Sequence, residues 1–409
     1  MKSAGHKSED LKTQLKINKI HDNKTVYPIQ INHHSGPINM VIFNESGLLF
    51  ATCSNDGFVN VYNSVDYSLI NSFQIDSKKS AVVFIAFNKT GDFIYGITLD
   101  KIFMIDVFRF PEEQIIMLAQ RPDFRILDFK LAFGDSSFFL LYRFMFGEDD
   151  LKKGQSINDL SIYTMKSLKD AYAPLIQKEN ELLEFEREKM KTMASLGSEP
   201  DVNRPLRNDQ IVEMPEPILH ITPDDSEFTK VAVYVDDNIV YLSKKSSQIS
   251  RYLLNQSTKT PTHSTVLKSS TINRLEFSSR FEFLIVSCND SINLLDPENL
   301  EIVHTLNTKF PVLSGKISPF LYDSNPKYHL IYAGGIAARD QAMKSEGGNE
   351  IMIYNFATGK IITKLGGCFG NVNFLDLFKD GSGLVTAGEE GYVRVYRFDL
   401  SYYKDKEFQ

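Results

Sequence analysis

A repeated pattern of three short apolar segments constrains the fold of this chain more than any other feature. Residues 34–62 read HSGPINMVIFNESGLLFATCSNDGFVNVY, and residues 270–296 and 367–396 share the same layout. Each copy has an apolar segment, a polar turn, a second apolar segment, an acidic turn and a third apolar segment. Segments of about five residues bounded by Asn, Asp, Gly or Ser are typical of antiparallel strands. A chain built from such units stacks them, because one unit cannot bury its apolar face alone.

The end of the third strand marks each copy along the chain. We predict it at seven positions: Tyr62, Ile105, Tyr163, Tyr241, Leu295, Tyr354 and Tyr396. The closest pairs are separated by the roughly 40–45 residues of a bare four-stranded unit, and the wider gaps imply insertions. The sequence therefore predicts an all-β, seven-bladed β-propeller.

The two ends of the chain are predicted to meet in the last blade. The last copy contains only three strands, while the segment VYPIQI at 26–31 precedes the first copy. A strand from 26–31 would complete the final blade and close the ring. The expected domains are a flexible, polar, lysine-rich arm at 1–25 and a propeller at 26–409.

The repeat resembles the WD repeat, although the chain contains no Trp. His34 stands at the place of the loop histidine and Asp56 at that of the turn acid. Asp290 and Glu390, the latter followed by Gly391, are the corresponding turn residues of other copies, and Asp100 and Asp237 are further candidates. Cys368 replaces a second loop histidine. Because a turn acid can accept hydrogen bonds from its own backbone and from the loop histidine, we interpret His34, Asp56, Asp290, Glu390 and Gly391 as structural residues.

A helix is predicted at 165–197, inserted between blades three and four. Pro174 suits a first helical turn, and the following apolar residues recur at helical spacing: Leu175, Ile176, Leu182, Leu183, Met190 and Met193. This apolar stripe either packs on the flank of the propeller or docks a helix of a partner.

Motifs for catalysis, cofactors and metals are missing from the sequence. There is no GxSxG elbow, GxxxxGK phosphate loop, CxxC pair or HExxH helix. Three cysteines are too few for a disulfide framework, and a net charge of −7 argues against a general binder of polyphosphates. No apolar stretch approaches the roughly 18 residues of a membrane span, and the N-terminus lacks a secretion signal. We expect a cytoplasmic protein with no catalytic residues, cofactor, metal or membrane contact.

Three stretches resemble the i subunits of eukaryotic translation initiation factor three. They are GLLFATCSNDGFVNVYNSVDYSLI at 47–70, residues 310–340, and GEEGYVRVYRFDLSYY at 388–403. The matching residues of the middle stretch are Pro311, Val312, Ser314, Ser318, Pro319, Gly334, Gly335, Ala338 and Asp340. The predicted insertion at 165–197 and the arm at 1–25 do not belong to the usual pattern of that family.

The resemblance implies a non-enzymatic scaffold in the initiation factor assembly. In that family the propeller binds the C-terminal helical part of the b subunit and also the g subunit. The assembly lies on the small ribosomal subunit and supports mRNA recruitment and scanning. The expected partners are therefore the b and g subunits and, indirectly, the small ribosomal subunit, with no direct DNA binding. The partner-binding residues are unknown.

Two other classes of function remain open. A WD-type scaffold could belong to a different complex, in RNA processing, signalling, vesicle coats or ubiquitin ligation. A propeller enzyme would need acids, histidines or a metal gathered at the central channel, and the sequence indicates no such set.

Overall fold

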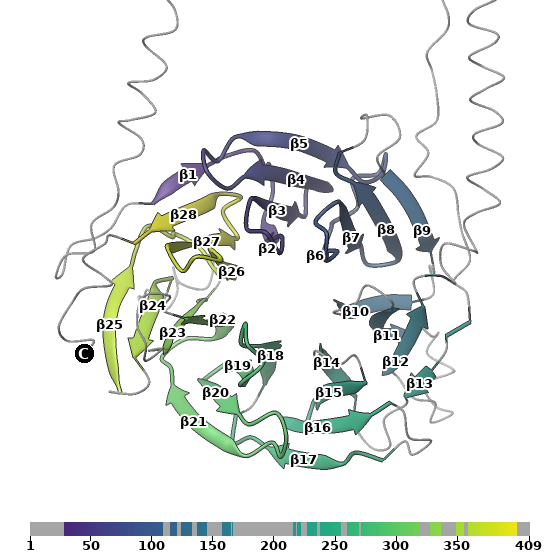
Figure 1. The fold of residues 1–409 in the computed structure, drawn as a ribbon, viewed down its shortest axis with the longest axis vertical. Coiled ribbons are helices and arrows are strands. Elements are labelled where there is room, and N and C mark those ends of the chain that lie inside the picture. Colours follow the sequence, from purple (N-terminus) through teal and green to yellow (C-terminus); the bar gives the residue numbers. More distant parts are fainter. Residues whose placement is uncertain are drawn as a thin grey trace, which may run out of the picture.

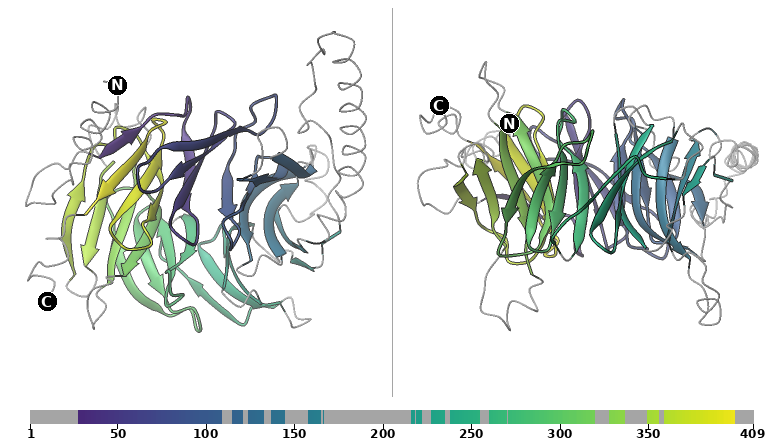
Figure 2. Two further views of the ribbon diagram at one scale, coloured as in Figure 1. Left: turned by 45° about the horizontal axis from the view of Figure 1, so that its top comes forward. Right: turned by 90° about the horizontal axis from the view of Figure 1, so that it is seen from below.

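Seven four-stranded sheets surround a central channel and confirm the predicted all-β, seven-bladed propeller (Figure 1). The computed structural model describes residues 28–108, 115–120, 124–132, 137–144, 158–164, 166, 216–217, 219–221, 227–234, 238–254, 260–269, 271–319, 328–336, 349–355 and 359–398. Seen from the side, the strands run between the two faces of the ring (Figure 2). No helix within these ranges is long and apolar enough to cross a membrane.

The first three blades contain twelve strands. Blade one consists of β2 (Ile38–Phe43), β3 (Leu49–Ser54), β4 (Phe58–Asn63) and β5 (Leu69–Gln74). Blade two consists of β6 (Phe84–Phe87), β7 (Phe93–Ile97), β8 (Lys101–Asp106) and β9 (Ile115–Gln120). Blade three consists of β10 (Phe124–Leu131), β11 (Ser137–Phe144), β12 (Asn158–Thr164) and β13 (Leu219–Ile221).

The remaining blades complete the ring. Blade four consists of β14 (Phe228–Val233), β15 (Ile239–Lys244), β16 (Gln248–Leu253) and β17 (His263–Val266). Blade five consists of β18 (Ile272–Phe277), β19 (Leu284–Cys288), β20 (Ser291–Leu295) and β21 (Ile302–Asn307). Blade six consists of β22 (Val312–Pro319), β23 (Tyr328–Gly334), β24 (Ile351–Asn355) and β25 (Lys360–Leu365). Blade seven consists of β26 (Val372–Leu377), β27 (Gly383–Gly388), β28 (Val393–Arg397) and β1 (Ile29–Ile31).

The apolar core lies between neighbouring blades. The second and third strands of a blade are covered on both faces, and β3, β19 and β20 are buried along their whole length. Ala51 and Val61 of blade one, for example, belong to the same apolar cluster as Ile85 and Ile94 of blade two. The fourth strand forms the outer rim, and β21 is mostly exposed. This layering explains why the middle strands read as continuous apolar runs.

The ring is closed by strands from opposite ends of the described chain. β1 pairs antiparallel with β28, with Ile29 opposite Val395 and Ile31 opposite Val393. Ile31 is 7% exposed and lies in the same apolar cluster as Ile38 and Val393. The first strand therefore completes a sheet whose other three strands come last in the sequence.

The predicted landmark in blade four is wrong by one strand. Tyr241 lies in β15, the second strand, whereas the third strand is β16 and carries Tyr252 near its end. The turn between these strands is at 245–247, where Ser247 has a φ of 62°. Asp237 lies outside the described residues, in the connection between the first and second strands, and so is not at the predicted turn position. In the sequence, Asp237 and the apolar segment after it resemble the acidic turn and third strand of a repeat, but that segment is the second strand.

The predicted insertion belongs to blade three and does not separate blades three and four. The chain leaves β12 at Thr164 and returns as β13, which pairs with β12 as the fourth strand of the same sheet. The predicted helix at 165–197 itself lies outside the described residues. β13 has three residues, too few for a recognisable strand pattern in the sequence.

Asparagines near the start of three inner strands link neighbouring blades. The side-chain amide of Asn273 donates to the carbonyl oxygen of Val312 at 2.9 Å, so β18 is tied to β22. Asn39 donates to the carbonyl oxygen of Val82 at 2.7 Å, and Asn373 to that of Ile38 at 2.9 Å. In each case the asparagine follows the first residue of its strand and reaches the next blade. The recurring Ile-Asn or Val-Asn pair is therefore an inter-blade link.

Asn273→Ala is expected to destabilise the fold by about 1–2 kcal/mol, because it removes the amide partner of a partly buried carbonyl oxygen. Asn307→Ala, an exposed position at the end of β21, is the matched control and should change the stability by less than about 0.5 kcal/mol. Urea unfolding of both variants measures the difference. Equal unfolding free energies would show that the link contributes nothing.

Candidate functional site

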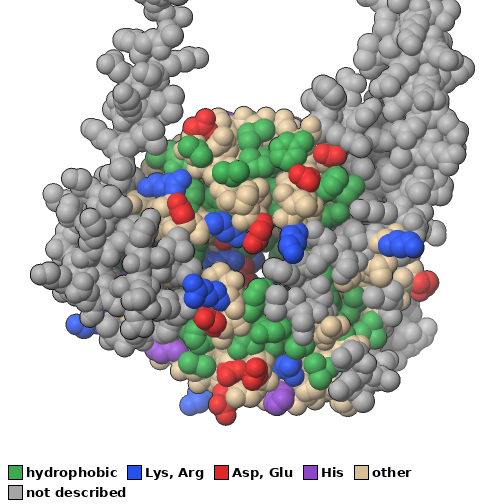
Figure 3. Space-filling view, viewed as in Figure 1, with side chains coloured by type: hydrophobic (Ala, Val, Ile, Leu, Met, Phe, Trp, Pro, Cys, Tyr) green, Lys and Arg blue, Asp and Glu red, His purple; other side chains and the backbone are tan. Residues whose placement is uncertain are grey.

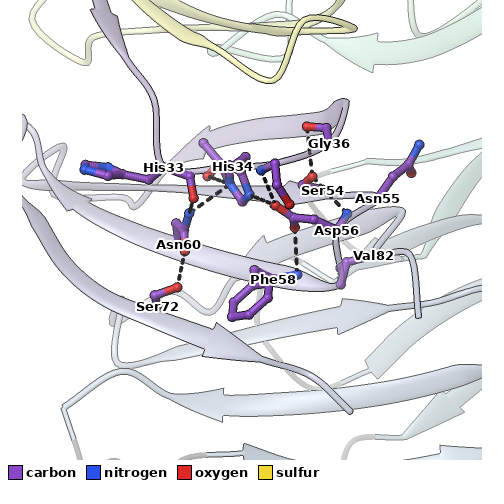
Figure 4. Close-up of polar contacts among 12 residues, drawn as sticks. His33, His34, Gly36, Ser54, Asn55, Asp56, Phe58, Asn60, Ser72 and Val82 are labelled. Atoms are coloured by element: carbon purple, nitrogen blue, oxygen red, sulfur yellow. Dashed lines mark hydrogen bonds and ion pairs between the residues drawn. The ribbon is translucent and has the colours of Figure 1, made fainter. Parts of the chain in front are cut away.

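A polar network joins the loop before blade one to the turn between its second and third strands (Figure 4). The Nδ1 atom of His34 lies 3.0 Å from Oδ2 of Asp56, and its Nε2 atom lies 2.7 Å from Oγ1 of Thr52. Asp56 also accepts hydrogen bonds from the backbone amides of Ser35 at 2.9 Å and Phe58 at 3.0 Å. The network fixes the shape of the turn and holds the entering loop against it.

The third strand completes this network through Asn60. Its side-chain nitrogen lies 3.1 Å from Nε2 of His34, and its oxygen accepts from Ser72 of the outer strand at 2.6 Å. Since an amide nitrogen can only donate, Nε2 of His34 accepts and Nδ1 carries the proton donated to Asp56. One chain of hydrogen bonds thus crosses from the loop through three strands of blade one.

The environment keeps His34 neutral and Asp56 ionised. Burial lowers the pKa of His34 and outweighs the opposing attraction of Asp56. Burial alone would raise the pKa of Asp56, but the amide of Ser35, the ring of His34 and the amide of Phe58 together hold it below its ordinary value. Both directions favour a neutral imidazole that donates to a charged carboxylate.

Blades five and seven build the same turn with other residues. In blade five Ser269 donates to Asp290 at 2.5 Å, and Thr305 of the outer strand donates to Asn293 at 2.8 Å, just as Ser72 donates to Asn60. In blade seven Glu390 accepts the amides of Phe369 and Gly370 and forms an ion pair with Arg394. Arg394 lies opposite Thr386 as Asn60 lies opposite Thr52, so it stands at the equivalent position.

Blade two replaces the histidine and acid by a buried ion pair. Asp76, in the loop before the blade, lies 2.6 Å from Nζ of Lys101 at the start of β8. The side chains of Asp76 and Lys101 are 0% and 7% exposed. Ser80 donates to the same carboxylate from its amide at 2.8 Å and from its hydroxyl at 2.6 Å. Asp100, a candidate from the sequence, lies in the adjoining turn and accepts from Thr98 at 3.1 Å.

Glycine follows the turn acid where the next blade approaches closely. Gly391 has a φ of 78°, and a Cβ atom there would lie 3.0 Å from the carbonyl oxygen of Gly36, in the loop that enters blade one. Gly57 has a φ of 85°, and a Cβ atom there would lie 2.6 Å from Cα of Lys79, in the loop that enters blade two. Both the backbone conformation and the lack of space require glycine at this position.

The sequence patterns pointed to the loop and turn residues of these networks, but not to the strand residues that connect them. His34, Asp56, Asp290 and Glu390 were recognisable from their turn positions, but Thr52, Asn60 and Ser72 carry no motif of their own. The signal that could have found them is a polar residue inside an otherwise apolar strand, because such a side chain needs a partner when buried. Asn60 and Asn293 stand out in this way within VNV and INL.

The described residues offer no evident catalytic or metal centre. Among them, no three His, Cys, Asp or Glu side chains form a group that could hold a metal ion. Burial raises the pKa of the Cys53 and Cys288 thiols, which disfavours the reactive thiolate form.

The depressed pKa of His34 predicts a loss of stability on mild acidification. The unfolded chain takes up a proton near the ordinary histidine value of 6.5, whereas folded His34 resists it, so stability falls as the pH drops below about 6.5. The contribution lost between pH 7.5 and 5.5 is at most about 1.4 kcal/mol. Asp56 contributes in a lower range, since its stabilisation is lost only below about its ordinary value of 3.8. Urea unfolding at several pH values measures the loss.

Two substitutions assign this pH dependence to His34. His34→Gln should remove the part of the slope between pH 7.5 and 5.5 that His34 contributes, whatever its effect on stability at pH 7.5. His263→Gln, at an exposed position in β17, should leave that slope unchanged. An identical slope in the wild type and in His34→Gln would contradict the assignment.

Comparison with known proteins agrees with this architecture. A model of the WD domain, G-beta repeat, matches residues 26–63. Eukaryotic translation initiation factor 3 subunit I of Eremothecium gossypii is 33% identical over 138 residues, which is 33% of this chain and 38% of that protein. The subunit I of Vanderwaltozyma polyspora is 30% identical over 196 residues, 47% of this chain and 54% of the relative. That of Brugia malayi is 32% identical over 136 residues, 32% of this chain and 40% of the relative.

The matched stretches thus cover between 38% and 54% of these relatives. They confirm the resemblance that the sequence motifs indicated. The chain is thus a seven-bladed β-propeller with a WD-type repeat at residues 26–63, and it is similar to subunit I of eukaryotic translation initiation factor 3.

Proposed function

We propose that this chain is a non-enzymatic scaffold subunit of translation initiation factor 3. The observation that carries the proposal is the similarity to subunit I in relatives as distant as Eremothecium gossypii and Brugia malayi. The proposed partners are the b and g subunits, with indirect attachment to the small ribosomal subunit in the cytoplasm. Within that assembly the chain would support mRNA recruitment and scanning.

The rim of the ring suits such a role. Outer strands leave one edge of hydrogen-bonding groups unpaired, and a partner can add a strand or lay a helix along them. Apolar side chains are exposed on four of these strands: Leu69 and Ile70 on β5, Val266 on β17, Ile302 and Val303 on β21, and Ile361 on β25. These positions support binding of proteins more readily than chemistry on a small substrate.

The polar turn networks have a structural part in this proposal. His34, Asp56, Asp290, Glu390 and Gly391 would hold the loops that join the blades and so keep the rim rigid. The proposed domains are a propeller at 26–409 and an N-terminal arm at 1–25.

Affinity purification of the tagged chain from its own cells tests the proposal. Under mild salt we expect the other factor subunits, identified by mass spectrometry, and co-migration with small ribosomal subunits on a density gradient. A stable complex without factor subunits would favour a WD scaffold of another assembly. Recovery of the chain alone would contradict a scaffold role.

Matched rim variants sharpen this experiment. Ile70→Glu on β5 and Val303→Glu on β21 alter exposed side chains on different blades, so both should fold. Loss of factor subunits from one variant and not from the other would identify the docking blade. The unaffected variant then serves as the control for folding.

A further inference from the structure

The inner strands place charged side chains in the central channel, unevenly around the ring. In every blade except blade two, the residue just after a register shift near the start of the inner strand occupies an equivalent place. It is apolar in β2 and β26, where it is Met40 and Phe374, and polar in β10 and β22, where it is Asp128 and Ser314. In the adjacent blades four and five it is Lys230 and Arg274. Figure 3 shows a hollow at the centre of the ring with Lys or Arg side chains inside it.

Lys230 and Arg274 lack a carboxylate partner among the described residues. The guanidinium of Arg274 lies over the ring of Phe374 at 4.3 Å, and its Nε atom donates to the carbonyl oxygen of Leu313 at 3.1 Å. No hydrogen bond or ion pair joins Lys230 to the parts of the chain that the structure describes. Two cations therefore lie in neighbouring blades, and no carboxylate of the described residues forms an ion pair with either of them.

The acids nearby are already engaged. Asp128, which attracts Lys230, is 3% exposed and accepts hydrogen bonds from the amides of Val231 at 3.0 Å and Phe129 at 2.9 Å. Glu276 pairs with Lys316 at 3.1 Å. Asp376 accepts the amide of Phe43 at 2.9 Å and lies 3.9 Å from Lys316. Glu276 and Asp376 thus neutralise Lys316, and Asp128 lies 3.8 Å from Lys130.

An unneutralised lysine in this position is unfavourable for the protein alone. Burial is the largest influence on Lys230 and lowers its pKa, and the positive charges of Arg274 and Lys130 act in the same direction. A bound anion would offset the repulsion between Lys230 and Arg274 and raise the pKa of the lysine again. An enclosed site also strengthens such an interaction relative to water.

We propose that Lys230 and Arg274 form a binding site in the central channel for a small tetrahedral dianion of the phosphate class. The guanidinium of Arg274, held over the ring of Phe374, presents its remaining N–H donors in the planar arrangement that suits phosphate oxygens. Lys230 supplies a second positive charge from the next blade. The site is local, so it is compatible with an overall net charge of −7.

Thermal unfolding and calorimetry of the full chain with inorganic phosphate test the site. At constant ionic strength and pH 7.5, phosphate should raise the Tm of the wild type by at least about 2 °C relative to chloride. Lys230→Met and Arg274→Met should each weaken phosphate binding about tenfold or more, because each removes a charge-assisted contact. Lys245→Met, an exposed lysine, is the control for general salt effects and should respond like the wild type. Sulfate should act like phosphate on the wild type.

A second measurement does not depend on the ligand. In chloride, Lys230→Met should be at least as stable to urea as the wild type, because methionine fills similar space without the unpaired charge. The proposal is overturned if phosphate acts no differently from chloride, or if Lys230→Met keeps the full phosphate response. A marked loss of stability of Lys230→Met in chloride would also overturn it, since this would reveal a partner for the lysine within the protein.

Discussion

Lys101→Met is expected to lower the free energy of unfolding by about 3–5 kcal/mol, because it leaves a buried carboxylate without its counter-charge. Asp76 is fully buried, and Lys101 lies 2.6 Å from it. The two hydrogen bonds from Ser80 remain in the variant but cannot supply a positive charge. Urea unfolding at pH 7.5 measures the loss. Lys78→Met, an exposed lysine of the same loop, is the control and should cost less than about 0.5 kcal/mol.

The pH dependence of the stability difference between the wild type and Lys101→Met distinguishes loss of the ion pair from loss of side-chain packing. Burial alone would raise the pKa of Asp76, but Lys101 and Ser80 hold it below its ordinary value of 3.8. The stabilisation from the pair is therefore present above about pH 4 and is lost as the pH falls through the folded pKa. The gap between the wild type and Lys101→Met should narrow below pH 4, and the double variant Asp76→Asn with Lys101→Met should be less destabilised than Lys101→Met. A gap that stays constant with pH would indicate lost packing.

The ring could be predicted from the sequence because each turn acid stands between two apolar strands. Asp56, Asp290 and Glu390 mark the same hairpin in three blades, and Tyr62, Leu295 and Tyr396 are the last or the last but one residues of the strands that follow. Local turn chemistry and the period of a strand are properties of neighbouring residues. The sequence therefore contains them directly.

Blade four could not be predicted correctly from the same signals. Its turn at 245–247 has no Asp or Gly, and Ser247 adopts the positive φ that glycine has in Gly57 and Gly391. The acidic pair Asp236–Asp237, between the first and second strands of the blade in the sequence, resembled the turn motif of the other blades more closely. Tertiary packing of β15 and β16 thus fixes a turn whose local sequence does not specify it.

Contacts between blades also could not be predicted from sequence patterns. The pair Lys101–Asp76 spans 25 residues, and Asn373 reaches Ile38 across 335 positions. The partner of each polar side chain depends on how the blades are arranged around the ring. The same holds for Lys230 and Arg274, which share a channel because their strands are inner strands of adjacent blades. The first strand, β1, has the most distant partner in the sequence, since it pairs with β28, the last of the described strands.

Ile31→Ala should destabilise the ring by about 2–4 kcal/mol, because Ile31 is buried in the cluster that joins blades seven and one. Gln30→Ala, on the exposed side of the same strand, is the matched control and should cost less than about 0.5 kcal/mol. Urea unfolding compares the two variants.

A truncated chain separates loss of packing from loss of ring closure. A chain that begins at His33 lacks β1 and leaves β28 as an unpaired edge, so it should be less stable than Ile31→Ala and prone to self-association. A peptide of residues 26–32 added in trans should restore part of the stability, because it can pair with Val393 and Val395 in the place of β1. Sedimentation and urea unfolding with and without the peptide measure both effects. A truncated chain that is monomeric and as stable as the full chain would mean that the ring is held by contacts between blades alone and needs no closing strand.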